Sequence, residues 1–252
     1  MDVLQAYDEQ IRTRVLPPRT FEQVGPLLRV TRLSGSGFIT YRDLAGMDGD
    51  ALDALIAAEC DHFAAIGEEV EWKLHGHDLP EDLGDRLKAA GFVAEERETV
   101  MIGEVAKLAG DVVLPAGVAL REAVSLEDWA RVQAFEESIW GLGLGAVFRG
   151  LWEEKVAGGD PVVMLMVEAG GEVVCASWMR LHQGTDFVSL WGGSTLPAWR
   201  GRGIYRATVV DRANRAGGYR YLQVDASDES RPILARLGFE SVTTTTPYVF
   251  RP

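Results

Sequence analysis

Three arginines and two glycines alternate between residues 200 and 206, in the order RGRGIYR. Glycine lets the backbone approach an anion closely, because it has no Cβ atom and tolerates a positive φ. The arginines add positive charge that pairs with phosphate oxygens. The segment is therefore predicted to bind a phosphate or pyrophosphate group, although the same motif by itself is also typical of a solvated helix cap.

The elements around this segment place it where anion sites occur. A strand is predicted over residues 187–196 and a helix from the second glycine through Ala216. A strand-to-helix turn brings free backbone N–H groups to the positive end of the helix dipole, which favours phosphate. An ATP site of the P-loop kind is disfavoured, since the segment lacks the Lys-Ser/Thr pair and the magnesium carboxylate.

A longer order of elements frames the loop. Upstream the pattern predicts a strand at 118–121, a helix from a Ser125/Asp128 capping box to about 139, an amphipathic stretch at 148–155, and strands at 162–168, 172–181 and 187–196. Downstream come a strand to 224 and a short helix that starts near Ser230 and ends in Leu237-Gly238-Phe239. Residues 196–204 (LPAWRGRGI) in this order closely resemble the pyrophosphate loop of the GNAT N-acetyltransferase superfamily. The resemblance extends from about residue 118 to 250.

This resemblance implies an α/β (α+β) GNAT fold, with a mixed twisted sheet flanked by helices, and acetyl-CoA as acyl donor. The loop backbone would wrap the pyrophosphate, strand residues 194–196 would pair with the pantetheine arm, and a strand N–H would stabilise the oxyanion. A bulge at Gly192-Gly193 and splaying of this strand from residues 221–224 would open the slot for the arm. The cofactor-binding residues assigned on this basis are Ser194, Thr195, Leu196, Arg200, Gly201, Arg202, Gly203, Ile204, Tyr205, Arg206 and Ser227.

Three positions depart from the family pattern. Tyr205 stands where the loop usually ends in Gly or Ala, so its side chain must point away from the phosphate. Leu234, four residues before Gly238, replaces a tyrosine that often protonates the departing thiolate, and leucine cannot donate a proton. Ser227 replaces a common asparagine. A CoA-binding regulatory or scaffold protein without turnover therefore stays open beside the enzyme.

The catalytic and substrate residues are assigned with their alternatives. Ser230 is predicted to protonate the thiolate, and its alternative role is a helix N-cap. Asp225, at a strand end bordering the slot, is predicted to take a proton from the amine, or else to cap a turn. Glu136 and Trp140, beside the glycine-rich joint at 141–145, are predicted to bind a cationic amine acceptor. Their alternatives are a solvated helix face and a core aromatic residue.

No metal is expected. His75, His77 and Asp78 have the residue types of a metal site, but no further His or Cys follows at ligand spacing in that segment. Cys60 and Cys175 are the two cysteines of the chain, and each is predicted to be a reduced, buried thiol.

The N-terminal half shows a weak repeat of the C-terminal half. Residues 70–74 and 83–92 read as strand, helix and Gly-Phe, as do residues 220–224 and 230–239. Two related lobes are therefore predicted, a degenerate GNAT-like lobe over 1–112 and a CoA-binding catalytic domain over 113–252. The first lobe carries Met47-Asp48-Gly49-Asp50 before its helix, and two aspartates repel pyrophosphate. An unrelated accessory domain is the alternative.

Composition sets the class of protein. The 252 residues are 47% hydrophobic and 25% charged, which is typical of a globular protein. The net charge of −13 disfavours nucleic acid and anionic membrane as partners and favours a cationic small molecule or peptide amine. No signal-peptide pattern opens the chain and no apolar run approaches the ~20 residues of a membrane span, so a cytoplasmic location is expected. The oligomeric state stays open.

Overall fold

The protein divides into two compact units. A computed structural model describes residues 2–15, 20–33, 36–141, 143–158 and 160–252. The first unit comprises Met1–Met101, Asp225–Pro232 and Ser241–Pro252, and the second comprises Ile102–Val224 and Ile233–Glu240. The C-terminal segments are thus shared between the units, whereas the lobes 1–112 and 113–252 remain a prediction. No helix among the described residues is long and apolar enough to cross a bilayer.

The first unit is a mixed sheet with helices. Its elements are α1 (Val3–Gln10), β1 (Thr20–Val24), β2 (Leu27–Leu33), β3 (Ser36–Thr40), α2 (Gly49–Ile66), β4 (Glu69–His75), α3 (Leu83–Ala89), β5 (Val93–Ala94) and β12 (Glu240–Phe250). The strand order is β1-β2-β3-β4-β12, and β5 also pairs with β12. β3 and β4 are parallel, while β12 is antiparallel to β4. β6 (Glu98–Glu104) crosses the boundary between the units.

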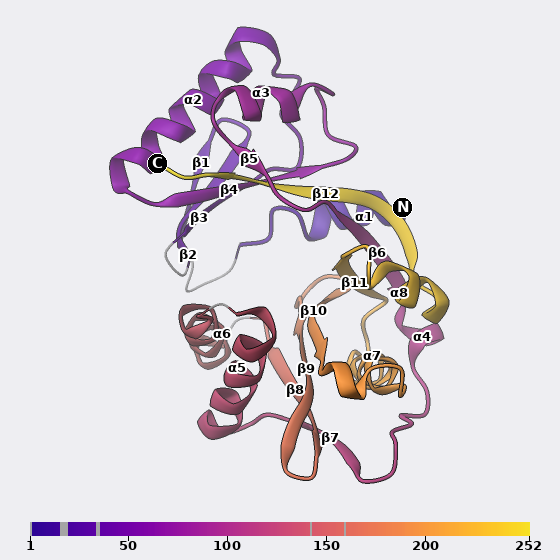
Figure 1. Cartoon of the computed structure of the whole chain (residues 1–252). Coiled ribbons are helices and arrows are strands. Elements are labelled where there is room, and N and C mark those ends of the chain that lie inside the picture. The colour runs from indigo at the N-terminus through magenta and orange to yellow at the C-terminus, as the bar shows by residue number, and fades with distance from the viewer. Residues whose placement is uncertain (1, 16–19, 34–35, 142, 159) are drawn as a thin grey trace. The chain divides into compact units, whose positions relative to one another are not determined.

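One face of this sheet is buried by α2 and α3 (Figure 1). Leu52, Ile56 and Phe63 recur on α2 at helical spacing and meet Trp72 of β4 in one apolar cluster. Gly37 of β3 allows the Phe63 ring to approach, because a Cβ there would lie 2.0 Å from its Cε1 atom. The helix thus presses closely on the strand that leads into its own start.

The second unit has the order of elements expected from the sequence. Its elements are α4 (Val105–Leu108), β7 (Val118–Glu122), α5 (Leu126–Trp140), α6 (Gly145–Ala157), β8 (Val162–Ala169), β9 (Glu172–Leu181), β10 (Phe187–Thr195), a 3-10 turn η1 (Pro197–Trp199) and α7 (Ile204–Arg215). β11 (Tyr221–Ala226) begins in this unit and α8 (Arg231–Leu237) ends in it, while residues 225–232 belong to the first unit. The strands follow the order β11-β10-β9-β8-β7. Among the described strands of this unit, β10 and β11 pair in parallel, whereas the pairs β10–β9, β9–β8 and β8–β7 are antiparallel.

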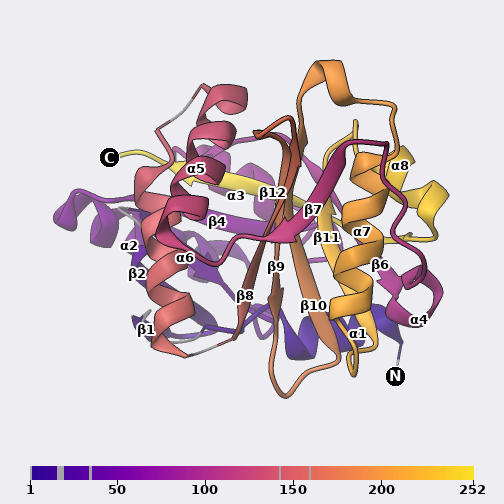
Figure 2. The same cartoon turned by 90° about the horizontal axis from the view of Figure 1, so that it is seen from below.

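Side chains that alternate along β8 and β9 build a core on each face of the second sheet. Met164 and Met166 pack with Trp129 of α5 and Phe148 of α6. Val167 and its neighbours on the other face pack with Ile204 of α7. Figures 1 and 2 both show α5 and α6 on one side of this sheet and α7 on the other. The sheet is therefore covered on both faces, which holds β10 firmly in place.

Local signals in the sequence correspond to the structure. Ser125 and Asp128 form the predicted capping box, in which the Asp128 N–H donates to Ser125 Oγ at 3.0 Å. Gly170 and Gly171 both have positive φ and make a two-residue hairpin turn between β8 and β9. Gly91 and Gly238 take the left-handed conformation just beyond α3 and α8, as predicted.

Candidate functional site

The loop between β10 and α7 has the backbone of an anion site. Gly201 and Gly203 have φ values of +72° and +80°, and Gly203 is the N-cap of α7. A Cβ atom at either position would meet nothing within 4 Å, so conformation rather than crowding requires glycine there. The N–H groups of the first helical turn lack partners within the helix. They are available to a phosphate.

The loop arginines are held by neighbours of the loop itself. Arg200 Nε donates to the carbonyl oxygen of Thr195 at 3.1 Å, and the Arg202 guanidinium lies 4.7 Å above the Trp199 ring. Arg206 is exposed on the first turn of α7. That turn contains no acidic residue, so the helix dipole and the arginines add up to an uncompensated positive site. The residues fit the pyrophosphate that acetyl-CoA would bring.

Tyr205 packs against the strand. A Cβ atom on Gly193 would lie 2.6 Å from Tyr205 Cε2, so the ring occupies the space above that glycine. Burial raises the pKa of the Tyr205 phenol. The tyrosine that departs from the family pattern is therefore accommodated by a glycine twelve positions earlier on β10, a pairing that no local sequence signal indicates.

β10 has the expected bulge. Its register with β9 shifts between Gly192 and Ser194, which leaves Gly193 as an extra residue. Its parallel register with β11 covers Phe187–Ser189 against Tyr221–Gln223 and is not continued among the described residues. The two strands thus separate toward the loop, as the predicted slot for a pantetheine arm requires.

Glu136 and Trp140 of α5 meet Ser194 of β10. Glu136 Oε2 accepts from Ser194 Oγ at 2.7 Å and from Trp140 Nε1 at 2.9 Å, and Trp140 Nε1 also lies 3.2 Å from Ser194 Oγ. Glu136 is 1% exposed, whereas Trp140 is 61% exposed. Burial raises the pKa of Glu136, while the hydrogen bonds from Ser194 and Trp140 oppose that rise. Glu136 therefore does not belong to a solvated helix face.

The residues predicted to act on the thiolate and the amine lie in the first unit. Ser230 directly precedes α8, and its N–H donates to Ser227 Oγ at 3.3 Å. Asp225 Oδ2 accepts from Lys73 Nζ at 2.5 Å, a partner on β4 that the sequence does not indicate. Leu234 is fully buried. The roles of Ser230, Asp225 and Ser227 stay predictions.

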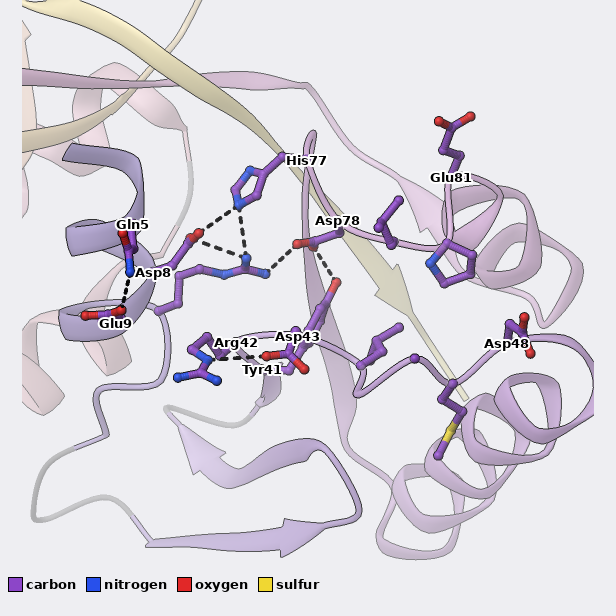
Figure 3. Close-up of a pocket in the computed structure, with 16 residues that line it drawn as sticks. Gln5, Asp8, Glu9, Tyr41, Arg42, Asp43, Asp48, His77, Asp78 and Glu81 are labelled. Atoms are coloured by element: carbon purple, nitrogen blue, oxygen red, sulfur yellow. Dashed lines mark hydrogen bonds and ion pairs between the residues drawn. The ribbon is translucent and has the colours of Figure 1, made fainter. Parts of the chain in front are cut away.

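A second strand-to-helix start, between β3 and α2, opens on a pocket of about 830 Å³ in the first unit. Figure 3 shows Asp43, Asp48 and Asp78 around it. Six carboxylates and three basic residues line this pocket: Asp8, Glu9, Asp43, Asp48, Asp78 and Glu81 with Arg12, Arg42 and His77. The excess of carboxylates over basic groups makes it a poor site for pyrophosphate.

Inside this pocket several polar groups are paired with one another. Asp78 accepts from Arg12 Nη2 at 2.8 Å and from the Tyr41 hydroxyl at 2.7 Å, and His77 Nε2 lies 3.1 Å from Asp8 Oδ2 (Figure 3). Within the described part of the chain, no group of three His, Cys, Asp or Glu side chains is placed to hold a metal ion. The His75–Asp78 segment thus serves an internal network, with Asp78 at its centre.

Comparison with known proteins gives the fold. No protein-family model and no curated protein matches the sequence. A GCN5-related N-acetyltransferase from Kribbella flavida aligns with a TM-score of 0.67 at 17% identity, over 99% of this chain and 93% of that one. A tandem GNAT protein from the clavulanic acid biosynthesis pathway aligns with a TM-score of 0.66 at 13% identity, over 93% and 84%. A GCN5-related N-acetyltransferase from Sphaerobacter thermophilus gives 0.62 at 16%, over 90% and 76%.

This chain has the GNAT fold. The fold class predicted from the sequence is therefore confirmed, and the likeness to a tandem GNAT protein covers most of the chain. Within the GNAT fold, the β10–α7 loop and the bulged strand before it belong to one compact unit. The three neighbours share less than a fifth of their residues with this chain, so their fold carries over and their substrates do not.

Proposed function

We propose that this chain is a cytoplasmic N-acetyltransferase that transfers an acetyl group from acetyl-CoA to a primary amine of a small molecule or peptide. The observation that carries the proposal is the start of α7. There, two glycines with positive φ, a first turn without acidic residues and three arginines follow a bulged strand in a GNAT fold. Such a start favours a phosphate group, and acetyl-CoA carries a pyrophosphate that would meet this need.

The chemistry follows from the arrangement of the strand and the loop. The loop N–H groups and arginines hold the pyrophosphate, and residues 194–196, at the end of β10 and just beyond it, extend beside the pantetheine arm. Acetyl-CoA supplies the activated thioester, and an N–H of β10 stabilises the oxyanion that forms when the amine attacks. Holding both substrates together supplies much of the rate, since attack becomes effectively intramolecular.

For the first unit we propose a degenerate GNAT-like lobe that does not bind CoA. Asp48 precedes α2 and Asp50 lies in its first turn, so the protein's own carboxylates take the place that an anion takes at α7. The carboxylate-rich pocket at the same helix start supports the same proposal.

A non-catalytic CoA-binding protein is the second candidate, because buried Leu234 cannot protonate a thiolate. The test combines binding with turnover. Acetyl-CoA is titrated calorimetrically, and thiol release is then followed with a panel of alkylamines, diamines, amino sugars and peptide N-termini. One bound acetyl-CoA per chain with amine-dependent thiol release supports the enzyme. Binding without release for any amine supports the second candidate, and no binding at all refutes both.

A further inference from the structure

Glu136 is a buried carboxylate whose second oxygen has no hydrogen-bond partner among the described residues. Its Oε2 atom accepts from Ser194 and Trp140, but its Oε1 atom is buried and makes no hydrogen bond. A buried polar atom without a partner is unfavourable, and such an atom in a native structure calls for an explanation, such as a ligand that it binds. No ion pair of Glu136 with a Lys or Arg occurs in the described ranges.

We propose that Glu136 is the base that takes a proton from the acceptor amine, with Ser194 as its positioning residue. This inference rests on the proposed acetyl transfer. Ser194 is on β10, directly after the bulge, and Glu136 is on α5. The 2.7 Å hydrogen bond between them therefore ties the carboxylate to the strand proposed to lie along the pantetheine arm.

The surroundings of Glu136 suit a base. From β9, the titratable group that interacts with it is the Cys175 thiol, whose pKa burial raises to about 11, so that group is neutral near pH 7. From β10 comes the Ser194 hydroxyl, and from its own helix the Trp140 indole. Glu136 thus has hydrogen-bond donors but no cation beside it. A desolvated carboxylate without a cation holds a proton more strongly than an exposed one, which makes it a better base.

Trp140 marks where the substrate nitrogen would bind. Its indole N–H donates to Glu136 Oε2, although the ring is 61% exposed. An amine N–H has the same donor character, and Oε1 offers it a second acceptor. Trp140 would then shield the carboxylate from water until the amine arrives.

In the proposed transfer, two protons leave the substrate nitrogen. Glu136 carboxylate takes one proton from the substrate ammonium, and the amine lone pair forms a C–N bond to the thioester carbonyl carbon. The tetrahedral intermediate collapses with cleavage of the C–S bond, and the second proton from nitrogen goes to the thiolate sulfur. Glu136 then releases its proton to water. Asp225 is less suited to this role, because Lys73 already occupies its carboxylate.

The first experiment measures how ionisation of Glu136 changes the stability of the protein, without any turnover. Melting temperatures of the wild type and Glu136→Gln are compared from pH 4 to 9, with Glu153→Gln, an exposed carboxylate on α6, as control. Because the folded pKa of Glu136 is raised, its contribution to stability is present below the ordinary value of 4.5 and lost as pH rises through the folded pKa. Glu136→Gln should match the wild type at pH 4 and melt at a higher temperature at pH 8. Glu153→Gln should show no such pH-dependent gain.

The second experiment measures turnover against pH with acetyl-CoA and the best amine of the panel. Glu136→Gln should lose about 100-fold or more in kcat/KM while acetyl-CoA affinity stays within twofold. On the acid side of the wild-type profile, kcat/KM should decrease with a midpoint at the Glu136 pKa found from the melting temperatures. Ser194→Ala should move the acid limb and the pKa found by melting to higher pH by up to about one pH unit. The reason is that this substitution removes a hydrogen bond to the ionised Glu136 carboxylate.

The outcomes distinguish failure of the proposed acetyl transfer from failure of the Glu136 assignment alone. If the wild type binds acetyl-CoA but releases no thiol with any amine, the proposed transfer fails and this inference with it. If the wild type turns over and Glu136→Gln keeps the acid limb or most of its rate, only the assignment of Glu136 is overturned. An acid limb that stays fixed in Ser194→Ala while the melting pKa moves likewise overturns it.

Discussion

Each unit of the protein runs a strand into a loop and then into a helix, and the two helix starts differ in charge. β3 leads to α2 in the first unit, and β10 leads to α7 in the second. Gly49 and Gly203 both have positive φ, at +52° and +80°, with open space around them. α2 begins among aspartates, whereas α7 begins among arginines.

This comparison shows how one backbone arrangement, a strand that leads into a helix start, can differ in its preference for an added anion. A helix N-terminus favours negative charge whatever its sequence. At α2 the side chains of Asp48 and Asp50 already supply that charge. At α7 the first turn has no acidic residue, and the arginines increase the positive potential. An external anion is therefore proposed only at the second start, where arginines surround the loop and the first helical turn carries no carboxylate.

The largest expected effect comes from the glycines at the two starts. Gly203→Val should lower acetyl-CoA affinity about 100-fold, because a β-branched residue at positive φ costs about 1–3 kcal/mol and displaces the loop N–H groups. Gly49→Val introduces the same side chain at a comparable φ in the other unit. Calorimetric titration should show unchanged affinity for Gly49→Val. Equal losses in both variants, or none in Gly203→Val, would contradict the assignment of the loop.

The next effect concerns the bulge in β10, the strand that precedes α7. Gly193→Ala should destabilise the protein by about 2 kcal/mol, because its Cβ would meet the Tyr205 ring. Tyr205→Ala in the same chain should recover part of that loss. Urea denaturation of the single and double variants gives the coupling. Additive losses would mean that the ring does not rest on this glycine.

A smaller effect is expected from charge alone. Arg206→Ala should weaken acetyl-CoA binding about fivefold at low ionic strength, and the difference should shrink in 0.5 M salt because screening weakens exposed charge pairs. Arg149→Ala removes the same charge from an exposed position on α6, on the opposite side of the sheet from α7 (Figure 1), and serves as control. A salt-independent loss for Arg206→Ala would point to a structural rather than an electrostatic role.

The smallest expected effect tests the aspartates. Asp48→Asn with Asp50→Asn should leave acetyl-CoA affinity and the stoichiometry of one per chain unchanged, since the first start is proposed not to bind CoA. Isothermal titration measures both quantities. A second binding event would contradict the proposal that the first unit is a degenerate lobe without a CoA site.

The sequence predicted the second unit well because its signals are local. The capping box at Ser125, the Gly170-Gly171 turn and the RGRG loop each depend on neighbours within a few residues, and the fold class followed from their order. The contacts of Glu136 with Ser194 and of Tyr205 with Gly193 join residues far apart in the chain. No local pattern in the sequence indicates these two contacts. The pairing of Asp225 with Lys73 spans most of the chain and was likewise out of reach.

The division of the chain between the units matters for how the protein forms during translation. β12 pairs with β4, yet it leaves the ribosome after the whole second unit has been made. Until then β4 is paired with β3 on one edge only, and its other edge is open. Open strand edges can pair with strands of other chains. The first half of the nascent chain therefore cannot close its sheet early. The order of synthesis is N-terminal first, but completion of the first unit comes last, when residues 241–252 take their place.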